Sequence, residues 1–288
     1  RRRHTRLQGD WSSDVCSSDL KCDVELETDP EALKVTAPDE EALRKLYAEL
    51  EFKTWLAELG GLNESPEAGA AKESHYELVL DEKALRRWIG KLSEAPMFAF
   101  DTETTSIDAM QARLVGVSFA VTAGEAAYVP VGHDYLDAPK QLALEAVLDA
   151  LRPLLEDPKH QKLGQNLKYD CTVLYNHGVS LDGITFDTML ESYVLDSTGS
   201  RHDLDTLALK YLGHKTIHYE DVAGKGKGQL TFNQVPIEQA GPYAAEDADI
   251  ALRLHHAIYP RLEKEASQEA LFQRIEIPLV PEIGRAHV

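Results

Sequence analysis

The sequence lacks the features that mark membrane and secreted proteins. None of its apolar runs approaches the ~20 residues that a helix needs to cross a bilayer, and no secretory signal segment stands near its start. It has only three cysteines, Cys16, Cys22 and Cys171, and no C-x-x-C pair, so their spacing indicates neither a disulfide framework nor a zinc knuckle. We therefore expect a protein of a reducing cytoplasm.

Basic residues are scarce. The chain has 30 Lys and Arg against 49 Asp and Glu, which gives a net charge of −19. This charge argues against non-specific attraction of the whole surface to nucleic acid. It leaves open binding in one cleft, because carboxylates that hold divalent cations turn a negative site into one that attracts phosphate. With 288 residues, the chain is long enough for one or two domains with a sizeable core.

The two ends of the sequence show no pattern typical of a fold. Residues 1–20 have no hydrophobic period and do not begin with Met, and we interpret them, like residues 282–288, as non-native adapter sequence. Within the acidic region that follows, leucines and Trp55 recur near helical spacing over residues 40–59, which predicts a pair of amphipathic helices. Residues 61–74 are rich in Gly, Ala, Ser and Glu, as in a linker.

A compact domain is predicted to begin near residue 75 and to end near residue 262. Strand patterns cover residues 76–79, 97–100, 114–121, 126–131 and 162–165. Helical patterns cover residues 144–155 with a break near Pro153, 167–177, 188–195, 204–212 and 242–262. Strands followed by alternating helices predict an α/β sandwich with a mixed sheet.

The first chemical motif is FAFDTETTSID, residues 98–108. Side chains at i and i+2 of a strand share a face, so Asp101 and Glu103 project together at the end of an apolar strand. Adjacent carboxylates repel each other unless a cation neutralises them, and hard oxygen ligands suit Mg²⁺ or Mn²⁺. In isolation this short pattern is better explained by a turn with solvated side chains.

The second motif is GQNLKYD, residues 164–170. Asn166 is expected to cap the helix that follows, and it lies on one helix face with Asp170 because the two are four residues apart. Alone, an ordinary cap followed by a surface aspartate explains this motif.

The third motif is GPYAAEDADIAL, residues 241–252, where Pro242 suits a first helical position. Tyr243 and Asp247 are four residues apart, so a phenol and a carboxylate lie side by side among small alanines that permit close approach of a ligand. Glu246 and Asp249 lie off this face and are expected to be solvated. Alone, a core tyrosine with a solvated aspartate explains this motif.

In this order and with these spacings, the three motifs resemble those of the DEDD exonuclease superfamily in its tyrosine branch. FAFDTETTSID, KLGQNLKYD, AGKGKGQLTFNQ and YAAEDADIALRLHH are similar to the 3′-5′ proofreading domains of the bacterial DNA polymerase I family, over roughly residues 75–262. Residues 21–74 resemble the tail of that family's 5′-nuclease region with its linker. Residues 263–281, which include ALFQRIEIPLVP, resemble the start of its polymerase domain, most of which this chain lacks. The resemblance implies a ribonuclease-H-like fold, a mixed β-sheet flanked by α-helices.

The resemblance also implies a reaction and its residues. The 3′-terminal phosphodiester of DNA would be hydrolysed with two divalent metal ions, Mg²⁺ or Mn²⁺, to release nucleoside 5′-monophosphates, and the parent protein would act in DNA replication and repair. Asp101, Glu103 and Asp247 would hold one ion, and Asp101 with Asp170 the other. Tyr243 and Glu103 would orient the attacking water.

The implied substrate is a single-stranded or frayed 3′ end of DNA. Ile107 would wedge at the terminal bases and Tyr219 would stack on a base, although ordinary partial burial explains these two residues nearly as well. Contacts to the last nucleotides or phosphates would come from Gln165, Asn166, Tyr169 and Arg201. The expected state is a monomer in the bacterial cytoplasm, associated with the nucleoid and not with a membrane.

Two other functions stay open. A ribonuclease of the same superfamily that trims RNA 3′ ends shares the third motif, but a helical nucleic-acid-binding domain should follow it instead of ALFQRIEIPLVP. A non-catalytic module that positions DNA would not need the four carboxylates, and a helicase-linked exonuclease is a more distant option.

The run AGKGKG, residues 223–228, lacks the spacing of a phosphate-binding loop and is expected to form a flexible turn. His255 and His256 are expected at the surface or a helix end, and no zinc site is expected at His214 and His218.

Overall fold

The computed structural model describes residues 38–50, 52, 55, 74–199 and 201–286. The chain forms two compact units, residues 1–64 and 65–288. In the first unit, helix α1 spans Glu40–Glu49, and the Asp39 carboxylate caps it by accepting from the Ala42 N–H at 3.0 Å. This helix agrees with the first half of the predicted pair. The predicted second half, the linker and the N-terminal adapter lie largely outside the described residues.

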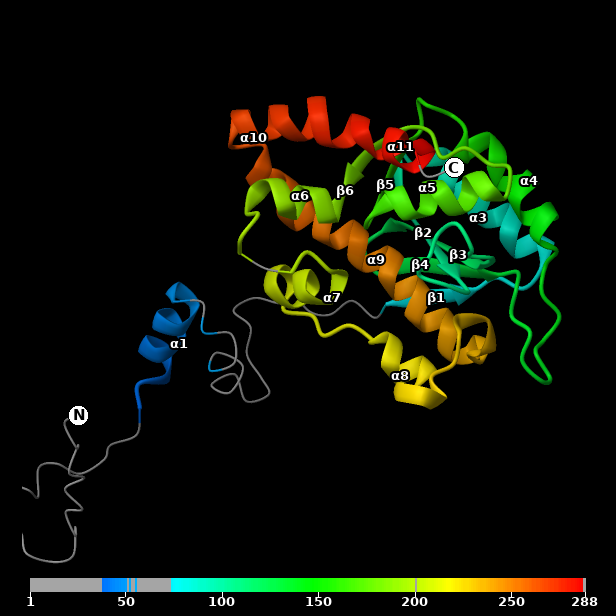
Figure 1. The fold of residues 1–288 in the computed structure, drawn as a ribbon, viewed down its shortest axis with the longest axis horizontal. Helices are drawn as coiled ribbons and strands as arrows, with labels where there is room; N and C mark the ends of the chain where they lie inside the picture. Colours follow the sequence, from blue (N-terminus) through cyan, green and yellow to red (C-terminus); the bar gives the residue numbers. More distant parts are fainter. Residues whose placement is uncertain (1–37, 51, 53–54, 56–73, 200, 287–288) are drawn as a thin grey trace, which may run out of the picture. The chain divides into compact units, whose positions relative to one another are not determined.

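A six-stranded mixed sheet with the order β1-β4-β3-β2-β5-β6 forms the centre of the second unit (Figure 1). Strand β3 is antiparallel to both of its neighbours, β2 and β4, and the pairs β1–β4, β2–β5 and β5–β6 are parallel. The strands are β1 His75–Leu78, β2 Met97–Thr104, β3 Leu114–Thr122, β4 Glu125–Pro130, β5 Gln161–Gly164 and β6 Ile184–Asp187. Five were predicted within a few residues. The sequence analysis missed β6, which is only four residues long and therefore too short to give a clear periodic signal.

Helices flank both faces of this sheet. They are α3 Glu82–Glu94, α4 Leu144–Leu155, α5 Leu167–Asn176, α6 Thr188–Leu195, α7 Leu204–Leu207, α8 Tyr219–Ala223, α9 Ile237–Leu262, α10 Ala266–Leu271 and α11 Ile277–Ala286. Short π-helical turns follow α7 and α10 at Ala208–Leu212 and Phe272–Glu276, and 3₁₀ turns span Gly226–Gly228 and Phe232–Gln234. Among the described helices, none combines the length and apolar character required to cross a bilayer.

Strand β2 separates two cores because its side chains alternate between the faces of the sheet. Phe98 and Phe100 belong to the large core that α3, α4 and α5 cover. Ala99 belongs to a smaller core, rich in alanine, beneath α9. The long helix α9 therefore runs close across this second face (Figure 1). The same alternation directs Asp101 and Glu103 toward α9 and leaves Thr102 on the side of α5.

At two prolines, Pro153 and Pro242, the helices differ from the sequence predictions. Helix α4 continues through Pro153 without a break, and α9 begins at Ile237 instead of at Pro242. A helical proline leaves the carbonyl four residues earlier without its N–H partner. Those carbonyls belong to Asp149 and Glu238, whose exposed positions allow water to satisfy them.

The segment after α9 packs back onto the same unit. Phe272, Ile277 and Val280 are buried, and α11 contacts α5 and β6. Residues 282–286, predicted to be non-native, form the last turns of α11. The predicted domain boundaries are not tested by this packing and stay predictions.

Candidate active site

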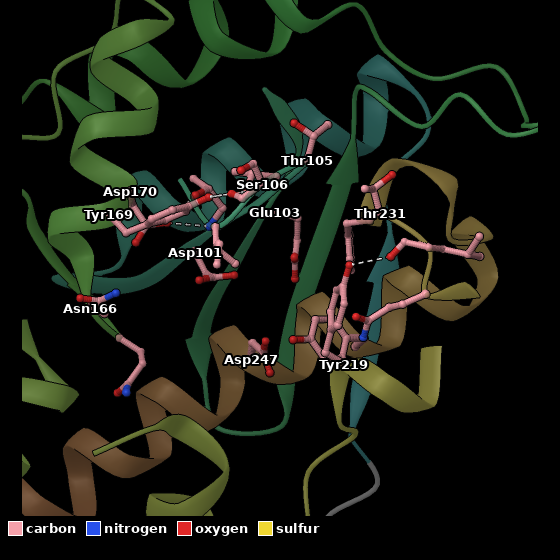
Figure 2. A pocket seen from close by; sticks show the side chains of 18 residues that line it. Asp101, Glu103, Thr105, Ser106, Asn166, Tyr169, Asp170, Tyr219, Thr231 and Asp247 are labelled. Carbon is pink, nitrogen blue, oxygen red and sulfur yellow. Dashed lines mark hydrogen bonds between the residues drawn. The ribbon is translucent and has the colours of Figure 1, made fainter. Parts of the chain in front are cut away.

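A pocket of about 590 Å³ lies at the end of β2, between α5 and α9. Its lining includes residues 101–107 from β2 and the following loop, residues 165, 166, 169 and 170 at the start of α5, and Tyr243 and Asp247 of α9. Tyr219 and residues 229–232 complete the wall. Figure 2 shows the side chains of Asp101, Glu103 and Asp247 directed toward one shared space.

Three carboxylates meet in this pocket. Asp101, Glu103 and Asp247 each offer one oxygen, and these atoms lie within 4.8 Å of one another. Glu103 is only 9% exposed, and its Oε1 atom has no hydrogen-bond partner. A buried carboxylate oxygen without a partner is costly unless a cation or a donor satisfies it. The three residues therefore fit the ligand set of a hard divalent cation.

The fourth carboxylate arrives from α5. Asp170 is 2% exposed, and its Oδ1 atom accepts two hydrogen bonds from Thr102, at 3.0 Å from the backbone N–H and 2.5 Å from the hydroxyl. Figure 2 shows Asp170 on the α5 side of Asp101. The structure thus brings together all four acidic residues that the sequence analysis selected.

Burial raises the pKa of every carboxylate in the cluster. The pKa of Asp101 rises to about 7 because its carboxylate is desolvated. Desolvation also raises the pKa values of Glu103, Asp170 and Asp247 well above their ordinary range, and for each of them the neighbouring charge of Asp101 adds to the effect. Without a cation, the buried carboxylates lower their mutual repulsion and their desolvation cost by taking up protons. A divalent cation would supply the missing positive charge and keep them ionised.

Tyr243 lies one helical turn before Asp247 on α9. Desolvation and then the charge of Asp247 raise the pKa of the Tyr243 phenol well above its ordinary value of 10.0. The phenol is therefore protonated at neutral pH and can donate a hydrogen bond. Its ring contacts Phe232, with ring centroids 5.7 Å apart, and Tyr219, with centroids 6.3 Å apart.

The predicted DNA contacts are distributed unevenly around this pocket. Ile107 is 99% exposed at its rim, which excludes a role for this side chain in the core of the described unit. Tyr219 stacks on Phe232, with an interplanar angle of 22°, and its hydroxyl donates to the Leu230 carbonyl at 3.0 Å. Arg201 is not part of the pocket lining, and its side chain is 89% exposed beside Asp203.

Asn166 is the N-cap residue of α5, but the predicted capping hydrogen bond is wrong. Its backbone is left-handed, with φ 64°, and its side chain makes no capping bond. Asp187 accepts instead from the Asn166 N–H at 3.1 Å and the Leu167 N–H at 2.8 Å. Because Asp187 caps the helix, the Asn166 side chain is left to line the pocket with Gln165.

Tyr169 also lines the pocket, but its hydroxyl already has protein partners. It contacts the Thr104 hydroxyl and donates to the Ser106 carbonyl at 2.5 Å. These hydrogen bonds of Tyr169 therefore stabilise the loop that carries Ile107. Direct contact between Tyr169 and a nucleotide stays a prediction.

Two acids on α9 are buried, so the prediction that they are solvated is wrong. Glu246 is 6% exposed and accepts from the Ile217 N–H at 2.6 Å, and one of its oxygens lies 2.9 Å from the His214 Nε2 atom. Asp249 is fully buried and accepts from the Tyr76 hydroxyl at 2.9 Å and the Gly124 N–H at 2.7 Å. Both acids anchor α9 to segments that are distant in the sequence, and such partners leave no local signal.

Of the two adjacent histidines on α9, His256 is exposed, as predicted. His255 is 7% exposed, and its Nδ1 atom lies 2.7 Å from a Glu191 oxygen, so its predicted surface position is wrong. His214 pairs with Glu246 and His218 with Asp205. In the described part of the chain, the metal-ligand cluster that the structure forms is the one in the pocket and includes no histidine.

Sequence analysis did not select Thr102 or Phe232. Thr102 belongs to the opposite face of β2 from Asp101 and Glu103, and the alternation of the strand was the signal that it faces α5. Phe232 is 1% exposed beneath Tyr219 and Tyr243. Only its place in the fold shows that it supports both rings.

Comparison with known proteins places this geometry in a family. A family model described as 3′-5′ exonuclease matches residues 76–263. The chain is 56% identical over 276 residues to the DNA polymerase I of Pseudomonas aeruginosa, covering 92% of this chain and 30% of that protein. It is 44% identical over 229 residues to the DNA polymerase I of Rhizobium leguminosarum, covering 74% and 22%. The chain thus spans less than a third of the length of these relatives.

Solved structures agree with the predicted ribonuclease-H-like α/β fold. The crystal structure of Trypanosoma brucei RNase D aligns with a TM-score of 0.59 at 16% identity over 74% of each chain. The POL domain of Pol1 from M. smegmatis, in complex with DNA primer-template and dNTP, aligns with a TM-score of 0.57 at 21% identity over 72% of this chain and 31% of that chain. These likenesses concern the fold alone. From the family match and the relatives, the chain belongs to the 3′-5′ exonuclease family, in the form found in bacterial DNA polymerase I, and is a nuclease.

Proposed function

We propose that this chain hydrolyses the 3′-terminal phosphodiester of DNA with two divalent cations, Mg²⁺ or Mn²⁺, and releases nucleoside 5′-monophosphates. The observation that carries the proposal is the meeting of Asp101, Glu103 and Asp247 within 4.8 Å in a pocket that also receives Asp170. None of the described residues that line this pocket is basic. The positive charge that a phosphate requires must therefore come from cations.

The four carboxylates divide into two ligand sets. Asp101, Glu103 and Asp247 would hold one cation, and Asp101 with Asp170 would hold the second. When bound, such a pair supplies a more acidic water and stabilises the attacking and leaving oxygens at phosphorus. The raised pKa values of these carboxylates support cation binding by the cluster, because each group gains from a nearby positive charge.

Two protein groups would orient the attacking water. The Tyr243 phenol is protonated and can donate a hydrogen bond to the water oxygen. Glu103 has an oxygen without a protein partner, which can accept a hydrogen bond from the same water. With donor and acceptor fixed on α9 and β2, the water would be held in line with the bond that breaks.

The substrate would enter as a single strand. Tyr219 offers a ring for base stacking, at about 1–3 kcal/mol per stacked base, and the exposed Ile107 can separate the terminal bases. Gln165 and Asn166 would contact the last nucleotides. The similarity to DNA polymerase I supports a proofreading role within a larger protein, in DNA replication and repair.

The test uses single-stranded DNA labelled at its 5′ end or at its 3′ end, incubated with Mg²⁺ or Mn²⁺ or with a chelator. We expect a ladder of shortening products from the 5′ label and an immediate mononucleotide from the 3′ label, both abolished by the chelator. Internal cutting, release of 5′-terminal nucleotides, or activity in the chelator would contradict the proposal. An RNA strand of the same sequence tests RNA trimming, the alternative that shares this superfamily.

A further inference from the structure

Strand β2 extends beyond its parallel neighbour on the α5 side. Strand β5 pairs with β2 only from Met97 to Ala99, so Thr102 lies past the end of that ladder. Its backbone N–H and its hydroxyl both donate to one oxygen of Asp170, and both residues are buried. The Asp170 side chain of α5 thus accepts the backbone hydrogen bond that a further residue of β5 would otherwise accept.

This arrangement restrains one oxygen of Asp170. Two donors hold Oδ1, at 3.0 Å from the N–H and 2.5 Å from the hydroxyl. The Oδ2 atom is left for another ligand. Because the N–H belongs to the rigid backbone of β2, the Asp170 carboxylate is fixed relative to Asp101, its neighbour across the pocket.

We propose that Thr102 is a positioning residue that holds Asp170 in the orientation required to bind the second cation. The inference rests on the proposed function and extends it. Strand β2 then serves the site from both faces, since Asp101 and Glu103 supply ligands on the α9 face while Thr102 clamps a ligand on the α5 face. The hydroxyl is the part of this clamp that a substitution can remove.

The alternative is that Thr102 only fills space. Threonine is common in strands because its branched side chain packs well on a sheet. Thr102→Val keeps this shape and removes the hydroxyl, whereas Thr102→Ser keeps the hydroxyl and removes the methyl group. The pair separates a hydrogen-bonding role from a packing role. Thr172→Val is the matched control, because Thr172 is also buried but donates within its own helix, to the Lys168 carbonyl at 3.0 Å.

The first measurement needs no metal. Crystal structures of the metal-free variants report the position of the Asp170 side chain. We expect Asp170 to leave its position in Thr102→Val and to keep it in Thr102→Ser and Thr172→Val. An unchanged Asp170 in Thr102→Val would overturn the inference, whether or not the chain degrades DNA.

The second measurement is direct titration with Mn²⁺, followed by the electron paramagnetic resonance signal of the free ion. We expect the weaker of two binding events to lose about tenfold in affinity in Thr102→Val, as removal of one charge-assisted hydrogen bond predicts, while Thr102→Ser and Thr172→Val stay within about threefold of the unaltered chain. Equal weakening in Thr102→Val and Thr102→Ser would assign the effect to packing and overturn the inference. If the unaltered chain bound no Mn²⁺, the proposed function would fail, and the crystal structures would still decide the role of Thr102.

Discussion

Asp101 stands at the centre of the acidic cluster, because its charge raises the pKa values of the three other carboxylates. Asp101→Ala should lower the rate of DNA degradation by more than about a hundredfold, a barrier of roughly 3 kcal/mol or more. The fold should survive, since Asp101 belongs to neither core. The rate is measured under single-turnover conditions, with circular dichroism as the control for folding. A rate within about tenfold of the unaltered chain would refute the role of Asp101.

The same carboxylate should make metal-free stability depend on pH. The pKa of Asp101 is about 7 in the folded chain against an ordinary value of 3.8, so the folded state binds the extra proton between these values. Stability is therefore highest when Asp101 is protonated and falls as pH rises through this range. In a chelator, the Tm should decrease as the pH rises from about 4 to about 7 and should change little above that, and Mg²⁺ should weaken this decrease. Asp101→Asn is the control and should have a flatter profile; an equally steep profile would contradict the assignment.

Tyr243 tests the orientation of the attacking water. Tyr243→Phe removes the hydroxyl and keeps the ring that packs on Phe232. We expect turnover to fall about 10–1000-fold with little change in DNA affinity, because the lost hydrogen bond acts in the reaction step. Turnover and DNA affinity are measured separately, the latter with a chelator present. Unchanged turnover would remove Tyr243 from the reaction, and weaker affinity alone would make it a binding residue.

At the scale of elements, the approach of α9 to the sheet decides the geometry of the site. Ala248 is fully buried in the small core with Ala99 and Ala120, so a larger side chain there must move the helix. Ala248→Leu should lower the free energy of unfolding by about 1–3 kcal/mol and reduce activity, because Asp247 would shift relative to β2. Denaturant unfolding gives the stability.

Ala257→Leu is the matched control on the same helix, since Ala257 is only partly buried. It should change stability and activity much less than Ala248→Leu. Equal effects from the two substitutions would show that the alanine face does not control the site.

At the scale of the whole molecule, we expect entry into the acidic pocket to determine which DNA ends are cut. Single-stranded or mismatched 3′ ends should be cut faster than paired ends, because fraying a matched end costs free energy before Tyr219 and Ile107 can hold the bases. Raising the temperature should reduce the difference between the two cutting rates, because heat favours fraying of the paired end. Rates are compared on substrates that differ only at the last base pair. Equal rates across temperature would contradict this mode of entry.

Much of the site could be predicted because its residues are encoded locally. Asp101 and Glu103 share a strand face, and Tyr243 and Asp247 share a helix face, so periodicity alone pairs them. The family resemblance then joined these pairs with Asp170. Ile107 could only be described as either a wedge or a partly buried residue, and its 99% exposure decides that it is not part of the core.

The remaining features depend on contacts between distant segments. Glu246 and Asp249 look like solvated helix residues in the sequence, but His214, Ile217 and the Tyr76 hydroxyl reach them from elsewhere in the chain. Asp187 replaces Asn166 as the cap of α5 for the same reason. Periodicity reports which side of an element a residue occupies, and it carries no information on which distant group arrives there.

By itself, the sequence determined the fold class, the four carboxylates and the family, because hydrophobic periods and short motifs depend on neighbours within a few residues. Only the tertiary structure decided that Thr102 holds Asp170, that Phe232 supports Tyr219 and Tyr243, and that α4 and α9 continue through their prolines. These outcomes depend on burial and on hydrogen bonds between elements that meet only in the folded chain. Their free energies outweigh the local preferences from which a sequence is interpreted.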